Sequence, residues 1–306
     1  VGGTLMKKRK RWGKEYIDKR DWKSYNKELI KRGEFYINPR FLYTWNKEIK
    51  DMNYRKEGNP YLYPESMAEF LAILHSKSFD YRALEGIMNA LSRKFNDFPV
   101  ISYPQICRRV NNLDINFKVN RSNLIVGSDG TGIKVSNRGD WMRHKWKVKR
   151  GWIKMVILGD TKGNIVDVIV GDEKLNEGKS SRRMIRKNKT KIKKLLGDGL
   201  YDSKEMFNLC KKLDIEPVIK IRKNASGKSD GSFLRKKHVK KFKKLGYKKW
   251  AKKTGYGMRW PCTEGIFSSV KRIFGEYVRS TNKENMYHEA KLKFWAYNQV
   301  KTCSIM

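Results

Sequence analysis

Three acidic residues, Asp129, Asp198 and Glu264, have types and positions suited to phosphodiester chemistry. Asp129 and Asp198 each follow a short apolar segment and precede a glycine, which lets the chain turn sharply at the end of a strand. Isolated carboxylates suit Mg2+, because this cation prefers oxygen ligands and stabilises charge at a transferred phosphate. Asp-Gly pairs also occur commonly in ordinary turns, so neither aspartate alone identifies a metal site.

Glu264 lies on a predicted helix that begins near Pro261, a residue suited to the first helical turn. At about 100° per residue, one face of this helix is apolar and consists of Ile266, Phe267, Val270, Ile273 and Phe274. Glu264 and Lys271 lie two turns apart on the opposite face, where one can face a metal and the other a phosphate. Taken alone, this geometry favours a solvated face with a spaced charge pair.

The composition indicates a polyanionic partner. Lys and Arg number 70 against 31 Asp and Glu, which gives 306 residues a formal net charge of +39. Nucleic acid relieves such self-repulsion, and its affinity for basic proteins comes largely from released counterions. A generally basic proteome would explain part of the excess. Double-stranded DNA is therefore the expected partner.

Two segments concentrate the positive charge. Residues 179–194 carry nine basic residues and no acid, and residues 223–258 carry 13 basic residues and one acid. Both are too charged for a core, and contacts to DNA phosphates explain them at least as well as solvated faces do. Tyr247, Trp250 and Tyr256 interrupt the second segment. They either stack on unpaired bases near a cut end or anchor a loop.

Several classes of protein do not fit this sequence. No apolar run approaches membrane-spanning length, and no apolar core follows the basic residues 7–11 as it would in a signal peptide. The four cysteines lie far apart without a Cys-x-x-Cys pair, which argues against a zinc site or a disulfide framework. We therefore expect no membrane partner and a reduced, cytoplasmic location.

Residues 1–117 are predicted to form a helical DNA-binding region. Helical periodicity covers residues 65–75 and 80–94, and a third helix starts at residues 102–104. Its outward face is polar and consists of Gln105, Arg108, Arg109 and Asn112. The pattern is typical of a helix-turn-helix, whose second helix enters the major groove, but the spacing fits an ordinary helical hairpin equally well. The overall charge favours the DNA interpretation.

Residues 118–306 are predicted to form an α/β catalytic domain with a basic loop at 223–258. Apolar strands are expected at 123–129, 152–158, 165–170, 192–196 and 217–222. The second and third are joined by a hairpin turn, and helices are expected before and after the fourth. This order indicates a mixed sheet rather than a doubly wound parallel one.

Taken together, the acidic motifs resemble those of the DDE transposases of bacterial and archaeal insertion sequences, in the insertion sequence four and five group. Their first Asp lies on the first strand of a ribonuclease-H-like core, the second follows the fourth strand, and the Glu lies on a later helix. Residues 197–203 resemble the second-Asp motif. The Glu motif is matched by Tyr256, Arg259, Glu264 and Lys271, although four residues rather than three separate Arg259 from Glu264.

The resemblance extends to the N-terminal region and covers most of residues 20–300. Residues 22–33 look like the opening of transposases in the sequence-five group. Residues 79–86 and 103–109 look like their helical DNA-binding region. The resemblance therefore implies a ribonuclease-H-like core preceded by helices that bind DNA, in a prokaryotic, nucleoid-associated protein.

The resemblance also implies a role for each site residue. Asp129 would bridge two Mg2+ ions, for which Mn2+ would substitute, and Asp198 and Glu264 would complete one site each. Tyr256, Arg259 and Lys271 would contact phosphates or position the strand end. Such enzymes hydrolyse the phosphodiester at terminal inverted repeats, and the freed 3′ hydroxyl then attacks target DNA. They work as dimers or larger synaptic complexes and form no covalent protein–DNA intermediate.

The sequence alone leaves three alternatives open. One is a catalytically inactive, transposase-derived DNA-binding protein, against which the intact Asp129, Asp198 and Glu264 argue. Another is a structure-specific nuclease on the same fold, and the N-terminal helices favour recognition of specific ends over it. A general RNA-binding protein would need neither the carboxylates nor their order. Mg2+-dependent cleavage of terminal repeats would separate all of these.

Overall fold

The computed structural model describes residues 9–11, 14–16, 21–95, 98–117, 119–136, 139–147, 151–228 and 231–303. The chain divides into one unit of Val1–Asn38 with Val300–Met306 and a larger unit of Pro39–Gln299. The first contains β1 (Arg9–Arg11), β2 (Lys14–Tyr16) and α1 (Trp22–Tyr36). None of the helices in the described part of the chain is long and apolar enough to cross a membrane.

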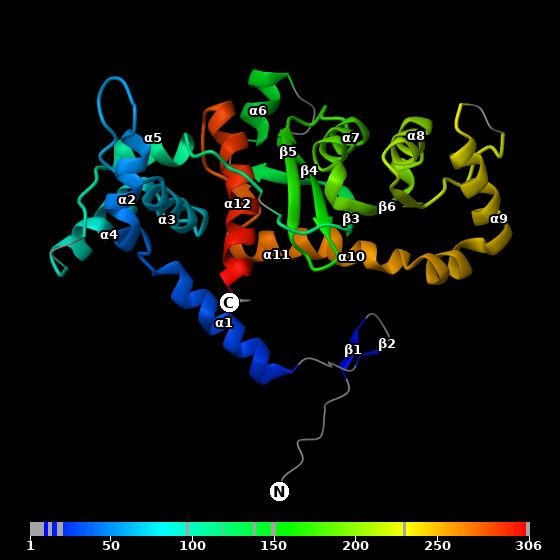
Figure 1. Cartoon of the computed structure of the whole chain (residues 1–306), viewed down its shortest axis with the longest axis horizontal. Helices are drawn as coiled ribbons and strands as arrows, with labels where there is room; N and C mark the ends of the chain where they lie inside the picture. The colour runs from blue at the N-terminus through cyan, green and yellow to red at the C-terminus, as the bar shows by residue number, and fades with distance from the viewer. Residues whose placement is uncertain are drawn as a thin grey trace, which may run out of the picture. The chain divides into compact units, whose positions relative to one another are not determined.

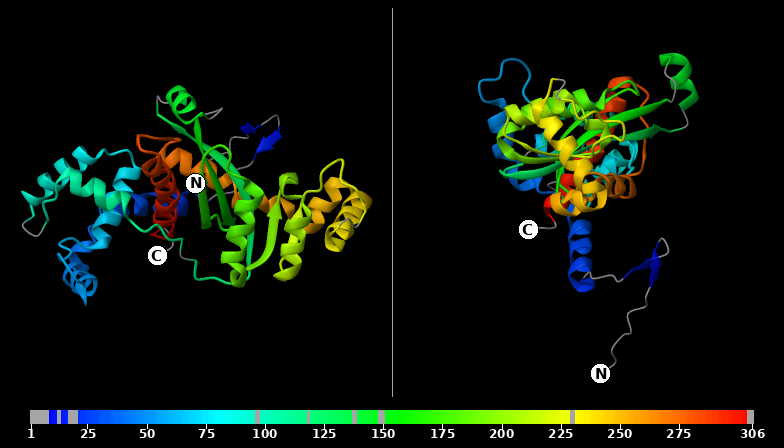
Figure 2. Two further views of the ribbon diagram at one scale, coloured as in Figure 1. Left: turned by 90° about the horizontal axis from the view of Figure 1, so that it is seen from above. Right: turned by 90° about the vertical axis from the view of Figure 1, so that its right-hand side faces the viewer.

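The larger unit contains a six-stranded sheet and the helices around it (Figures 1 and 2). Its strands are β3 (Leu124–Val135), β4 (Trp152–Asp160), β5 (Ile165–Gly171), β6 (Ile192–Gly197), β7 (Glu216–Ile219) and β8 (Tyr277–Val278). Its α-helices are α2 (Phe41–Asn53), α3 (Glu65–Ser76), α4 (Tyr81–Ser92), α5 (Tyr103–Asn111), α6 (Gly139–Trp146), α7 (Glu177–Lys187), α8 (Lys204–Lys212), α9 (Phe233–Thr254), α10 (Arg259–Cys262), α11 (Glu264–Phe274) and α12 (Lys283–Cys303), the last of which continues past this unit. Short 3-10 turns are η1 (Lys189–Lys191), η2 (Gly199–Tyr201) and η3 (Tyr256–Met258).

The sheet has the strand order β5-β4-β3-β6-β7, and β8 also pairs with β3. β4 pairs antiparallel with both β3 and β5, whereas β6 pairs parallel with β3 and β7 pairs parallel with β6. The predicted mixed, ribonuclease-H-like sheet is therefore confirmed, with β3 at its centre. The predicted hairpin between β4 and β5 is also present, and Gly163 adopts a positive φ of 76° in its turn.

The prediction that Asp129 ends a strand is wrong. β3 continues through Asp129 to Val135, and β4 pairs along it as far as Lys134, which lies opposite Trp152. Gly130 lies in extended backbone here, and its missing side chain makes room for another residue. A Cβ at Gly130 would lie 2.6 Å from the side chain of Glu177, at the start of α7. The glycine therefore serves helix packing rather than a turn.

Alternation along β3 sends successive side chains to opposite faces of the sheet. Ser128 faces α7, where its hydroxyl hydrogen-bonds that of Ser181. Asp129 consequently points to the other face, along which α10 and α11 run (Figure 1). The same alternation puts Gly127 on the Asp129 face.

Helix α10 lies unusually close to the sheet because two glycines face each other beneath it. Gly127 on β3 is paired in register with Gly159 on β4. A Cβ at Gly127 would lie 2.7 Å from the Cβ of Cys262, and one at Gly159 would lie 2.1 Å from the Cys262 carbonyl oxygen. Only glycine at both positions allows this approach.

The predicted N-terminal helices are confirmed as α3, α4 and α5, with Ile106 and Val110 of α5 buried. Residues 93–102 connect α4 to α5, a longer link than the short turn of a typical helix-turn-helix. These helices belong to the same unit as the sheet, and the side chain of Arg279 donates hydrogen bonds to the Ser78 and Phe79 carbonyls. The domain boundary near residue 117 stays a prediction.

The basic segment 223–258 contains helix α9 rather than only a loop. The side chain of Ser232 accepts a hydrogen bond from the Arg235 backbone N–H at the start of α9, and Gly255 ends the helix in the left-handed conformation. Gly246, with φ 69°, kinks it. Val239 and Trp250 are its buried residues, and the kink means that no single apolar face runs along the whole helix by which the sequence could reveal it.

Candidate active site

Asp198 follows β6 directly, as the sequence predicts, and begins the 3-10 turn η2. Its carboxylate accepts a hydrogen bond of 2.8 Å from the backbone N–H of Leu200. The side chain of Arg222 fixes the same turn, since its guanidinium donates to the Gly199 and Leu200 carbonyls at 2.6 and 3.1 Å. The Asp198 carboxylate is therefore held at the end of a strand adjacent to β3.

The second aspartate of the same motif, Asp202, has an anchoring role that sequence reasoning missed. It is buried and forms a two-point ion pair with Arg235 of α9, with N–O distances of 2.6 and 3.0 Å. It also accepts a hydrogen bond from the Arg222 backbone N–H. The turn that carries Asp198 is thereby tied to the start of α9.

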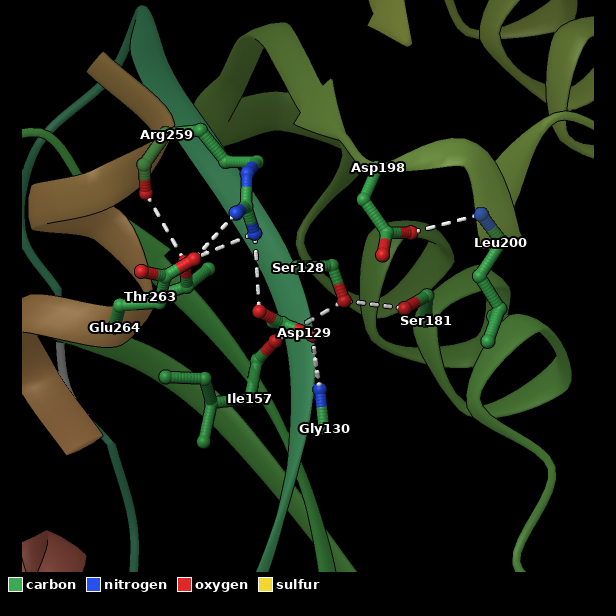
Figure 3. Close-up of polar contacts among 10 residues, drawn as sticks. All are labelled: Ser128, Asp129, Gly130, Ile157, Ser181, Asp198, Leu200, Arg259, Thr263 and Glu264. Atoms are coloured by element: carbon green, nitrogen blue, oxygen red, sulfur yellow. Dashed lines mark hydrogen bonds and ion pairs between the residues drawn. The ribbon is translucent and has the colours of Figure 1, made fainter. Parts of the chain in front are cut away.

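Arg259 joins the other two predicted carboxylates. Its guanidinium lies 3.0 Å from the Asp129 carboxylate and 2.5 Å from that of Glu264 (Figure 3). The Arg259 and Asp129 side chains are about one-fifth exposed, whereas that of Glu264 is about half exposed. The sequence predicted that these residues belong to one site but not that the arginine would bridge the acids.

The extra residue between Arg259 and Glu264 is accommodated by a break in the helix. α10 ends at Cys262, and Thr263 has a non-helical backbone with φ −133° and ψ −79° before α11 starts at Glu264. The Thr263 hydroxyl donates to the Arg259 carbonyl. Arg259 and Glu264 therefore meet despite the longer spacing.

The three carboxylates do not form a ready cluster. Within the described residues, no group of three His, Cys, Asp or Glu side chains gathers closely enough to hold a metal ion. Asp129 and Glu264 share the Arg259 guanidinium, while Asp198 binds the Leu200 N–H. The expected convergence is thus incomplete, because carboxylates repel and a guanidinium already neutralises two of them. The donor set still fits Mg2+, since it consists of hard oxygen ligands.

The electrostatics of Asp129 support a shared site. Burial raises the pKa of its carboxyl above the ordinary value, and the negative charge of Asp198 adds to the increase. The Gly130 N–H, at 2.8 Å, and the Arg259 guanidinium oppose that shift by stabilising the ionised form. Asp129 therefore lies within electrostatic range of Asp198, as well as in contact with Arg259.

The aromatic residues of the basic segment differ in exposure. Trp250 and Tyr256 are buried, and their ring centroids are 5.0 Å apart in a small cluster beside α10. Burial raises the pKa of Tyr256 to about 12. Tyr247 is half exposed, and the ammonium group of Lys220 lies over its ring. Trp250 and Tyr256 therefore fit the alternative in which these aromatic residues anchor the chain. Tyr247 is exposed enough to stack on an unpaired base.

The remaining predicted DNA contacts lie on α5 and α11. Arg108 is exposed on α5, but Arg109 is half-buried, with its guanidinium 4.8 Å from the centre of the Tyr63 ring. Gln105 is also half-buried, and it lines a cavity of about 740 Å³ beside α5 together with Arg109. Lys271 is half-buried on α11. Of these four side chains, that of Arg108 is therefore the most accessible to DNA.

Comparison with known proteins matches two transposase DDE domain models to most of the chain. A family model described as "Transposase DDE domain" matches residues 123–299, more than half of the chain, and a second model with that description matches residues 30–138. A solved structure, the cryo-EM structure of the piggyBac transposase synaptic complex with hairpin DNA, is 7% identical with a TM-score of 0.38. That match covers 90% of this chain and 75% of the other. On the extent of the first family match, this chain belongs to the transposase DDE domain family, as a DDE transposase catalytic domain.

Proposed function

We propose that this transposase belongs to a prokaryotic insertion sequence of the four and five group. It cleaves phosphodiester bonds at terminal inverted repeats and joins the freed 3′ end to target DNA. The supporting observation is that Arg259 bridges Asp129 and Glu264 on the face of the sheet next to the strand that leads to Asp198. Residues that are far apart in the sequence thus share one electrostatic environment.

Members of this family use divalent metals, and two Mg2+ ions suit the oxygen ligands here. Asp129 would be the shared ligand, with Asp198 and Glu264 completing one site each. Such ions supply charge stabilisation for the attacking and leaving oxygens of an in-line displacement. Arg259 and Lys271 would position the strand end through its phosphates, and Tyr256, which is buried beside Arg259, would act through that arginine. The protein would form no covalent bond to DNA.

The proposed partner is duplex DNA, bound by a homodimer or larger synaptic complex because two transposon ends are processed together. Helix α9 offers a strongly basic surface for this purpose. It contains no acidic residue, and its exposed lysines are Lys237, Lys240, Lys241, Lys243, Lys244, Lys248, Lys249, Lys252 and Lys253. The helix starts beside the Asp202 anchor and leads back to Arg259. A DNA strand along α9 would therefore reach the carboxylates of the proposed metal site. A protein with this partner would be associated with the nucleoid.

The proposed function is tested with duplexes that carry the inverted repeats flanking the gene. With Mg2+, we expect cleavage at the repeat end and, once target DNA is added, joined products; chelation should abolish both. Cleavage of branched DNA without preference for the repeats would indicate a structure-specific nuclease. Tight binding without cleavage in Mg2+ or Mn2+ would indicate an inactive DNA-binding descendant.

Replacing Lys248 and Lys249 of α9 by Gln should weaken binding to repeat and random duplexes alike. If each lysine neutralises one phosphate, the slope of log affinity against log salt should flatten by about two. Fluorescence anisotropy across a salt series measures this slope. The matched control is Lys211→Gln with Lys212→Gln, because these exposed lysines end α8, far along that helix from the turn that holds Asp198. An equal flattening by the control pair would refute a DNA surface on α9.

A further inference from the structure

The bridge between Asp129, Arg259 and Glu264 has a consequence for metal binding. A divalent cation shared by Asp129 and Glu264 would need the space between their carboxylates, and the Arg259 guanidinium occupies that space (Figure 3). The guanidinium donates a charge-assisted hydrogen bond to each carboxylate, at 3.0 Å to Asp129 and 2.5 Å to Glu264. Cation and guanidinium are therefore competitors for the same oxygens.

The position of Arg259 favours such a competition. Its backbone is fixed, because α10 is seated on Gly127 and Gly159. Its side chain is long and ends in a planar group with several donors, so the guanidinium can leave the carboxylates without any movement of the helix. The pair with Asp129 is only about one-fifth exposed, so salt screens it less than a surface pair.

DNA supplies the alternative partner for this arginine. A phosphate offers a guanidinium the same two-point, charge-assisted geometry as a carboxylate. The exposed side of the site bears the Glu264 carboxylate, about half of which is accessible, so a phosphate can approach from that side. Transfer of Arg259 from carboxylates to a phosphate would free oxygens on both Asp129 and Glu264.

We propose that Arg259 is an internal counterion that excludes divalent metal from the carboxylates until a DNA phosphate takes it over. Metal binding and DNA binding then reinforce each other, since each removes the obstacle to the other. This inference rests on the proposed function, because it assumes that Asp129 and Glu264 are metal ligands. It adds a regulatory role for Arg259: the DNA-free protein holds its metal site closed.

The test is Mn2+ binding to the full chain, followed by electron paramagnetic resonance, without DNA and with a short duplex. Arg259→Gln should bind Mn2+ about tenfold or more tightly than the wild type in the absence of DNA, because two charge-assisted hydrogen bonds no longer compete. Adding the duplex should tighten Mn2+ binding by the wild type much more than by the variant, after subtraction of Mn2+ held by DNA alone. Arg259→Lys, which keeps the charge but loses the two-point geometry, should fall between them and serves if the Gln variant is poorly folded.

Arg272→Gln is the matched control in the DNA-free titration, because Arg272 is an exposed arginine near the end of α11 with no proposed role in the site. It removes one positive charge from α11 without touching the space between the carboxylates, so it should change Mn2+ affinity less than about threefold. The inference is overturned if Arg259→Gln leaves the DNA-free affinity unchanged or lowers it, or if Arg272→Gln raises it equally. Strong, DNA-independent Mn2+ binding by the wild type would overturn the inference alone. Absence of Mn2+ binding from every protein, with or without DNA, would overturn the proposed metal site as well.

Discussion

Asp129→Asn should abolish DNA cleavage and strand transfer while DNA binding persists. The substitution keeps the size of the side chain but removes a negative charge from the centre of the proposed metal site. A metal at a transferred phosphate contributes several kcal/mol, so the rate should fall by about 1,000-fold or more. A gel assay with Mg2+ and repeat duplexes measures both steps, and an anisotropy titration measures binding.

The binding arm of that experiment separates catalysis from folding. Loss of one carboxylate should leave the affinity for DNA unchanged or slightly raised, because Asp129 repels phosphates. The asparagine should also retain a hydrogen bond to Arg259 and so preserve the local structure. Loss of DNA binding together with cleavage would instead indicate a structural role for Asp129.

Gly159→Ala should cause the second large loss, although Gly159 is not among the proposed metal or DNA ligands. The added Cβ would lie 2.1 Å from the Cys262 carbonyl oxygen and 2.5 Å from the Ile266 side chain, so α10 and α11 must move away from the sheet. Overpacking of this kind costs about 1–3 kcal/mol of stability. A shift of about 1 Å in Arg259 and Glu264 should slow cleavage by about 100-fold.

The matched control is Gly86→Ala on the exposed side of α4, where a Cβ would meet nothing within 4 Å. Alanine should stabilise this helix by up to about 1 kcal/mol and leave cleavage unchanged. Thermal unfolding and the cleavage assay at a temperature where both variants are folded provide the comparison. A normal cleavage rate and melting temperature for Gly159→Ala would show that the position of α10 does not require glycine at residue 159.

Local sequence patterns were sufficient to predict most of the helices and strands, whereas the membership of the candidate site stays a prediction. Apolar runs predicted five of the six strands of the large sheet but missed the two-residue β8, and Asp198 indeed follows one of the predicted strands. The same reasoning failed at Asp129, because Gly130 makes room for Glu177, a residue whose proximity depends on the packing of α7. It also missed α9, because the kink at Gly246 divides the helix and its charged residues obscure the apolar residues that pack on the core.

Contacts between distant segments were beyond the reach of spacing arguments. The Arg259–Asp129 pair joins residues 130 positions apart, and nothing in either local sequence specifies it. The close packing of α10 on the sheet could have been suspected from the sequence, since Gly127 and Gly159 are isolated glycines within apolar strands. Such glycines often mark a close approach of another backbone. Only the register of β3 with β4 shows that the two approach the same helix.

The central claim is that Asp129, Asp198 and Glu264 act as one metal-holding unit, and the Mg2+-dependent cleavage assay tests it most directly. Asp129→Asn, Asp198→Asn and Glu264→Gln are compared singly and combined, with DNA binding and thermal unfolding as controls. We expect each single variant to lose nearly all cleavage and the combined variant to lose little more, because groups that act as a unit are not additive. Cleavage of repeat DNA at the wild-type rate by any one of the single variants would contradict the account.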